Sequence, residues 1–76
     1  MVGQYVRIVV APARMGTVLA ARYDRGHISY LFHLDPRLSN KLPDAWIPES
    51  DMEECSRPTD EEVVAINLKG KKNGSR

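Results

Sequence analysis

Cysteine is almost absent from this sequence, since Cys55 is the only one among 76 residues. A disulfide within the chain needs two cysteines, and a cysteine-rich zinc site needs several. We therefore expect neither, and a reducing compartment suits such a chain best. At this length about 60% of the unfolded surface can be buried, so the core of a single domain must be thin.

Long hydrophobic runs are missing as well. No segment approaches the roughly 18 apolar residues of a membrane-spanning helix. Residues 1–7 lack the basic region and the apolar run of a signal peptide. We expect a cytoplasmic protein that makes no contact with a membrane.

Sequence motifs for nucleotide and acyl-transfer chemistry are absent too. The chain has no phosphate loop, no Gly-x-Gly-x-x-Gly and no Gly-x-Ser-x-Gly. Cys55 is a poor nucleophile because the neighbouring Glu53 and Glu54 raise the pKa of a thiol. We expect a protein that is not an enzyme and has no cofactor.

The histidines and acidic residues do not form a metal-binding pattern. His27 and His33 share one face of a predicted strand, but six residues at about 3.3 Å each place them roughly 20 Å apart. His33 and Asp35 are closer, yet two ligands do not make a site. The acidic residues of 49–62 lack the glycine-bearing spacing of a calcium loop. We expect no metal site.

Charge is distributed unevenly along the chain, although the net charge is only +1. Residues 42–62 carry eight acids against a single arginine, whereas residues 69–76 carry four basic residues and no acid. Without that basic tail the acids outnumber the bases. The net negative charge of the chain without its tail argues against a dedicated nucleic-acid-binding protein.

In three segments, 5–10, 17–23 and 27–34, the apolar residues recur at every second position. This period is typical of half-buried β-strands. Pro12 is expected to end the first strand, which makes 11–15 the first loop. Asp24-Arg25-Gly26 predicts a tight hairpin turn between the second and third strands.

Two shorter strands are expected after an exposed polar loop over 37–44. Ala45–Ile47 forms the first and ends at Pro48, a tight turn covers 49–51, and Met52 begins the second. The apolar positions on the inner faces should form one core: Val6, Ile8, Val18, Ala20, Ile28, Tyr30, Phe32, Leu34, Ile47 and Met52.

The C-terminal segment carries conflicting signals. Thr59 and Glu62 are spaced as a capping box, and Lys69-Gly70 is a typical helix end, so residues 60–69 are predicted as a short helix. An extra strand is the alternative, because three β-branched residues occur there, Val63, Val64 and Ile66. Residues 70–76 are polar and basic, and we expect a disordered tail.

Three groups of residues carry a resemblance to a known fold. They are Gly3, Val6 and Ile8, then Gly16-Thr17-Val18, and then Trp46-Ile47-Pro48. Together they resemble the SH3-like barrels, in particular the KOW and Tudor-like subgroup. The resemblance implies a small, all-β, five-stranded barrel over residues 1–55. Residues 56–69 are expected to pack on this barrel or on a partner, because their apolar side chains need to be covered. The first loop lacks the extra glycine typical of KOW elements that bind RNA.

Two functions are open at this point. Four apolar residues are expected on the outward faces: Tyr5, Val9, Leu19 and Leu31. They favour a protein-binding or accessory-subunit module of a larger assembly, or a homodimer. Partner contacts are then expected from surface aromatics: Tyr5, Tyr23 and Trp46. The alternative is an RNA- or DNA-binding KOW-like domain, with these basic residues as contacts: Arg14, Arg22, Arg25, Arg37 and Lys41.

Overall fold

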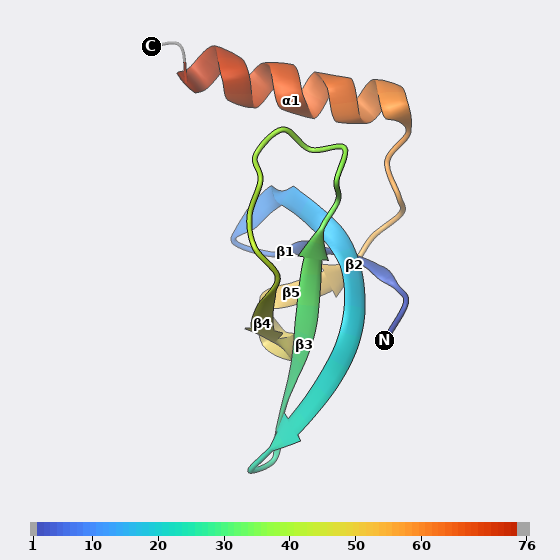
Figure 1. The fold of residues 1–76 in the computed structure, drawn as a ribbon, viewed down its shortest axis with the longest axis vertical. Coiled ribbons are helices and arrows are strands. Elements are labelled where there is room, and N and C mark those ends of the chain that lie inside the picture. Colours follow the sequence, from blue (N-terminus) through green and yellow to red (C-terminus); the bar gives the residue numbers. More distant parts are fainter. Residues whose placement is uncertain (1, 75–76) are drawn as a thin grey trace.

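A curled antiparallel sheet with a single helix beside it forms the fold, in a computed structural model that describes residues 2–74 (Figure 1). The sheet has five strands: β1 (Tyr5–Ile8), β2 (Ala11–Asp24), β3 (His27–Leu34), β4 (Ala45–Pro48) and β5 (Met52–Glu54). A 3-10 turn, η1 (Glu49–Asp51), joins β4 to β5, and the helix α1 (Asp60–Gly74) follows. The expected β class is thereby confirmed.

The strand order is β4-β3-β2-β1-β5, with β2 at the centre. The long β2 pairs with β1 through its first half and with β3 through its second half. The strand bends, so that it forms hydrogen bonds with both neighbours. The sheet is not closed, because β4 and β5 are its two edges. The strand pairing therefore does not confirm the expected barrel.

The hairpin between β2 and β3 forms where the sequence predicts it. Asp24 pairs with His27, which leaves Arg25 and Gly26 as a two-residue loop. Both have positive φ angles, 51° and 82°. This backbone matches the twist of the flanking strands and is readily adopted by glycine.

The connection between β1 and β2 differs from the prediction. The chain turns at Val9 and Val10, and Ala11 already pairs with Ile8, so the expected loop over 11–15 belongs to β2. The ladder then skips residues 12–14, since the next pair joins Arg7 to Met15. Proline lacks a backbone donor, and a gap in the ladder is one of the few places where a strand tolerates it.

The core contains most of the predicted residues. Those buried are Val6, Ile8, Val18, Tyr30, Phe32, Leu34, Leu38, Met52 and Val63, with Ile28, Ile47, Ala11 and Ile66 packed against them. Ala20 is wrong as a core residue: a bulge between Val18 and Ala20 shifts the register and sets it opposite Leu31, on the outer face. Leu38 lies in the loop that was expected to be exposed, yet it is only 3% exposed.

The helix prediction for the C-terminal segment is confirmed, and the alternative strand is wrong. The capping box forms, since the Thr59 amide donates to Glu62 Oε1 (2.8 Å) and the Glu62 amide donates to Thr59 Oγ1 (3.2 Å). These bonds satisfy two amides at the helix start. The helix runs on to Gly74, past the predicted end at Lys69, and residues 75–76 of the predicted tail lie outside the described residues.

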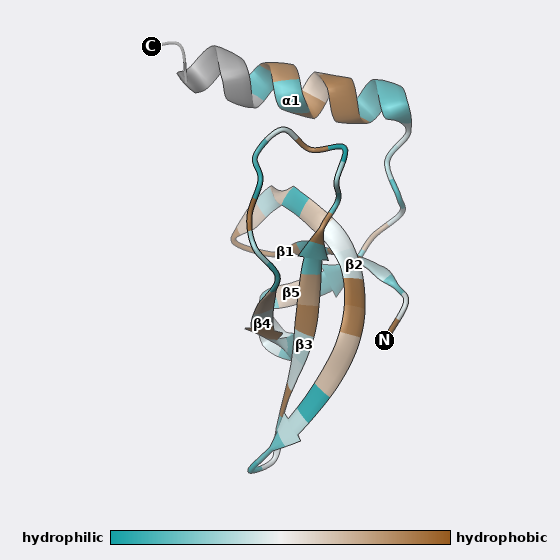
Figure 2. Cartoon of the chain, viewed as in Figure 1, coloured by the Kyte–Doolittle hydropathy of each residue, from teal (hydrophilic) through white to brown (hydrophobic). Residues whose placement is uncertain are grey.

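One face of α1 packs onto the end of the sheet, over the loop that follows β3 (Figure 1). Val63 on this face is only 4% exposed, while Val64 and Leu68 on the opposite side remain 55% and 61% exposed. These exposures place hydrophobic residues on both sides of the helix, and Figure 2 shows that they occur in the first half of α1. The helix folds back on its own chain. Within residues 2–74 no helix is both long and apolar enough to cross a membrane.

Gly16 should be essential for the approach of β2 to β3. A Cβ atom at this position would lie 2.0 Å from the carbonyl oxygen of His33, so a side chain would force the two strands apart. We expect Gly16→Ala to lower the free energy of unfolding by about 1–3 kcal/mol, measured by urea denaturation. Gly26→Asn is the control, because nothing lies near its Cβ and asparagine tolerates a positive φ. Equal stability of Gly16→Ala and wild type would contradict this packing.

Candidate functional site

Apolar side chains line up across the outer face of the sheet. The register places Ala20, Leu31 and Trp46 in one row across β2, β3 and β4. Leu19 occupies the bulge beside Ala20, where the strand carries one extra residue. We call these four residues, Leu19, Ala20, Leu31 and Trp46, the outer patch.

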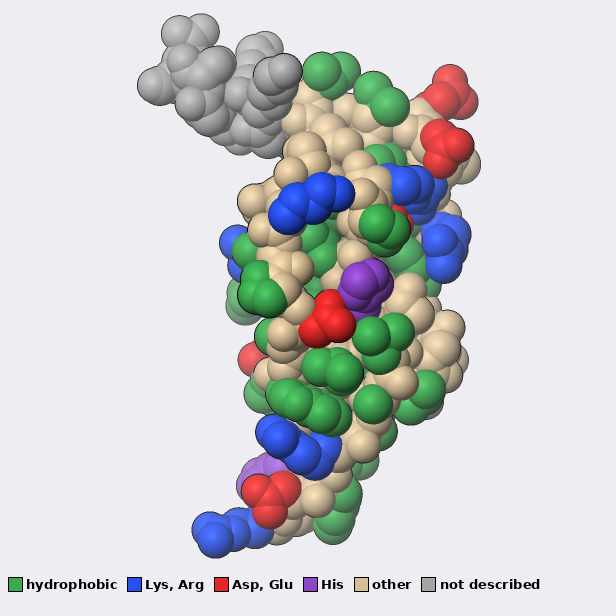
Figure 3. All heavy atoms as spheres, in the orientation of Figure 1, with side chains coloured by type: hydrophobic (Ala, Val, Ile, Leu, Met, Phe, Trp, Pro, Cys, Tyr) green, Lys and Arg blue, Asp and Glu red, His purple; other side chains and the backbone are tan. Residues whose placement is uncertain are grey.

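The outer patch is exposed to solvent and rimmed by polar groups. Leu19 is 46% exposed and Trp46 is 39% exposed. The guanidinium of Arg22 lies 4.5 Å from the centre of the Trp46 ring, a cation–π arrangement. His33 Nδ1 lies 2.7 Å from Asp44 Oδ1 on the same face. Figure 3 shows hydrophobic side chains gathered over this face, next to a histidine and an acidic side chain.

A buried carboxylate lies where β1, β3 and the following loop meet. Asp35 is 3% exposed, and its Oδ2 accepts a hydrogen bond from the Tyr5 hydroxyl (2.6 Å). The Arg37 side chain donates from Nη2 to Oδ2 (2.8 Å) and from Nε to Oδ1 (3.1 Å), and the Arg37 amide donates to Oδ1 (2.9 Å). Such a buried charge is stable only because both oxygens are bonded.

Arg37 extends this network to α1. Its Nη1 donates to Asp60 Oδ1 at the first turn of the helix (2.8 Å). Further along α1, the Asn67 side-chain amide donates to the Arg37 carbonyl (3.0 Å) and accepts from the Ser39 amide (2.9 Å). The loop after β3 is therefore fixed to the helix at two points.

The network shifts the acid–base properties of its members. Hydrogen bonds from Arg37 hold the pKa of Asp35 well below its usual range, and the same contact raises the pKa of Arg37. Burial, together with the bond to Asp35, raises the pKa of Tyr5. Folding therefore favours the charged forms of Asp35 and Arg37, and their hydrogen bonds connect β1, the loop after β3 and α1.

The three predicted aromatic binding residues do not meet. Tyr5 is engaged with Asp35, and the Arg57 guanidinium lies 5.1 Å from the centre of its ring. Tyr23 is 73% exposed near the tip of the hairpin. Since Tyr5 pairs with Thr17 and each strand residue advances about 3.3 Å, Tyr23 lies roughly 20 Å further along β2. Trp46 alone belongs to the outer patch.

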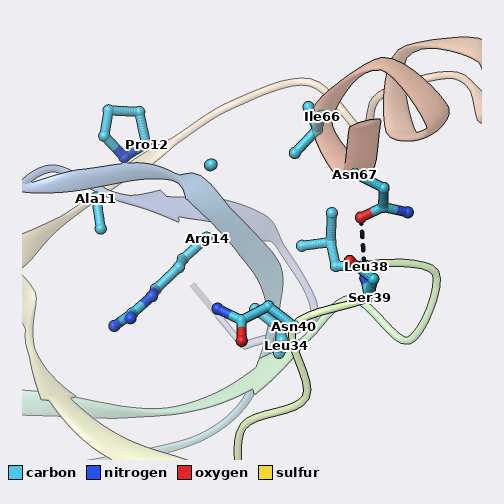
Figure 4. Close-up of a pocket in the computed structure, with 10 residues that line it drawn as sticks. Ala11, Pro12, Arg14, Leu34, Leu38, Ser39, Asn40, Ile66 and Asn67 are labelled. Atoms are coloured by element: carbon cyan, nitrogen blue, oxygen red, sulfur yellow. Dashed lines mark hydrogen bonds between the residues drawn. The ribbon is translucent and has the colours of Figure 1, made fainter. Parts of the chain in front are cut away.

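The five basic residues predicted for nucleic acid are also scattered. Arg37 is engaged with two carboxylates, and Lys41 Nζ donates to the Pro36 carbonyl (2.7 Å). Arg22 stacks on Trp46, and Arg25 lies in the hairpin turn. Arg14 extends into an opening between β2 and the loop after β3 (Figure 4).

Metal binding and cysteine chemistry find little support in the described part of the chain. No group of three potential metal-ligating side chains comes together there. His33 is paired with Asp44 rather than Asp35, which faces Tyr5 and Arg37 instead. Burial is the main cause that raises the pKa of the Cys55 thiol, which disfavours the reactive thiolate.

Comparisons with models of protein families, with curated proteins and with solved structures find no match to this chain. The resemblance to SH3-like barrels therefore remains a prediction from the sequence.

Acid should weaken the fold through Asp35. The pKa of this carboxyl is lowered by folding, whereas in the unfolded chain it titrates near pH 3.9. Its contribution to stability is complete above about pH 5 and decreases as the pH falls below that value. We expect Asp35→Asn to lower the free energy of unfolding by about 2–3 kcal/mol at neutral pH and to flatten its decrease between about pH 5 and 3.

Asp51→Asn is the matched control, because Asp51 is exposed and the same substitution there leaves the buried network intact. Urea denaturation across a pH series, followed by fluorescence of the single tryptophan, measures both effects. An acid dependence that is as steep in Asp35→Asn as in the wild type would show that another carboxyl carries it.

Proposed function

We propose that this chain is a non-enzymatic protein-binding module, or the accessory subunit of a larger assembly, which contacts its partner through the outer patch. The observation that carries the proposal is the row Leu31–Trp46, extended by Leu19, on the solvent side of a sheet whose other face is buried. Apolar residues gathered at one place mark interaction surfaces more often than residues scattered singly.

The composition of the outer patch suits a protein partner. Tryptophan and arginine are enriched among the residues that dominate binding energies, and here Arg22 already stacks on Trp46. Covering apolar surface contributes roughly 25 cal/mol for each Å² removed from water. The bulge at Leu19 adds a further side chain to this surface, as bulges near binding sites often do.

For this module we propose a location in the cytoplasm and the fold of an SH3-like barrel. Two features support this fold: strands β1 to β4 follow one another as a meander, and β5 returns to pair with β1. This return curls the sheet toward closure. The fold alone does not define a ligand, so the functional proposal depends on the outer patch.

Peptides selected from a random displayed library against the wild-type protein test the proposal. We expect the selected peptides to bind at least tenfold more weakly to Leu19→Ser and Trp46→Ser, because each substitution removes an exposed apolar contact from the outer patch. Tyr23→Ser is the control: Tyr23 is also an exposed apolar residue but lies outside the patch, so its affinity should be unchanged. Fluorescence anisotropy measures binding, and circular dichroism confirms folding of each variant.

Binding that persists in both patch variants would contradict the proposal. The nucleic-acid alternative predicts instead tight binding of short RNA or DNA, which weakens steeply with salt because bound counterions are released. We expect no such complex at physiological salt, since Arg37 and Lys41 are already engaged within the chain.

A further inference from the structure

Arg14 lies in the part of β2 that leaves the ladder. Residues 12–14 have no partner in the register between β1 and β2, because Ile8 pairs with Ala11 and Arg7 with Met15. An interruption of this kind turns side chains away from the direction that a regular strand would give them. Figure 4 shows the Arg14 side chain extending from β2 into the open space beside Leu34 and Asn40.

Two pockets share Arg14 in their linings, one between β2, the loop after β3 and α1, and the other between that loop and strands β1 to β4. One has a volume of about 250 Å³, and its apolar wall is made by Ala11, Pro12, Ala13, Leu34, Leu38 and Ile66. The other has a volume of about 280 Å³ and is lined by Ile8, Phe32, Leu42, Pro43, Ala45 and Ile47. We call this pair of pockets the Arg14 groove.

The Arg14 groove has a positive centre that the described part of the chain does not neutralise. Arg14 makes no ion pair there, in contrast to Arg7, which pairs with Glu53. The other polar side chains that line the two pockets are uncharged, namely Ser39, Asn40 and Asn67. Two apolar pockets that share one guanidinium are complementary to a carboxylate flanked by apolar groups.

We propose that the Arg14 groove binds an extended peptide segment with an acidic residue that is flanked, two positions away on each side, by apolar residues. In an extended chain, residues i−2, i and i+2 point to the same side at intervals of about 6.6 Å. The acidic side chain then bonds to Arg14, and the two apolar side chains enter the two pockets. This groove opens on the inner face, away from the outer patch, so it is a second binding site.

A titration of the ¹⁵N-labelled protein with the capped peptide Ac-Leu-Ser-Glu-Ser-Leu-NH₂, followed by NMR, tests this site. We expect amide shifts around Ile8, at 11–14 and at 38–45, with affinity about tenfold weaker in Arg14→Gln or with glutamine in the peptide. Arg14→Lys, which keeps the charge but not the forked geometry, should fall between wild type and Arg14→Gln. Arg25→Gln, in the hairpin turn and outside both the groove and the outer patch, is the matched control and should bind as the wild type does.

Three results would overturn the proposal. One is the absence of shifts at millimolar peptide, and another is binding that Arg14→Gln leaves unchanged. The third is equal binding of sodium octanoate at the same amides, which would assign the groove to small amphipathic acids. Shifts confined to the amides of the outer patch would likewise place the peptide on the other face and exclude it from the groove.

Discussion

The buried carboxylate of Asp35 is the contact on which the arrangement of this chain depends. A charge that is nearly withdrawn from water must have its oxygens bonded, and the donors come from β1 through Tyr5 and from the following loop through Arg37. Arg37 in turn reaches Asp60 at the start of α1. One anion therefore fixes the turn after β3, the position of the loop and the point where the helix docks. A core this thin gains a specific geometry from such a network in addition to its apolar packing.

This geometry gives the sheet two different faces. The inner face is filled by the core and closed at one end by the loop and α1, with Arg14 at an opening that remains. On the outer face, Arg22 and His33 flank apolar residues of which Leu19 and Trp46 are exposed, at 46% and 39%. We interpret the outer patch as the main binding surface and the Arg14 groove as a second, independent one. Both proposals concern non-covalent binding and not catalysis. Both depend on a rigid scaffold that presents exposed side chains.

The sequence predicts the parts of the fold that depend on neighbours along the chain. The alternation over 27–34, the Arg25-Gly26 turn and the capping box at Thr59 are local patterns, and each forms as expected. Burial of Leu38 and Val63 was not predictable in this way, because it results from segments far apart in the sequence folding onto each other. The same holds for the site. Leu19 and Leu31 are predictable as outward-facing residues and Trp46 as a candidate by its type, but the bulge that moves Ala20 from the core to this face has no clear sequence signal.

Trp46 offers the most direct measurement of the central claim, because it is the only tryptophan and lies in the outer patch. Acrylamide quenching of its fluorescence reports how accessible the ring is to solvent. We expect ready quenching in the free protein and clear protection when one of the selected peptides that Leu19→Ser weakens is bound. Tight binding of such a peptide that leaves Trp46 as accessible as before would contradict the assignment of this face as the binding surface.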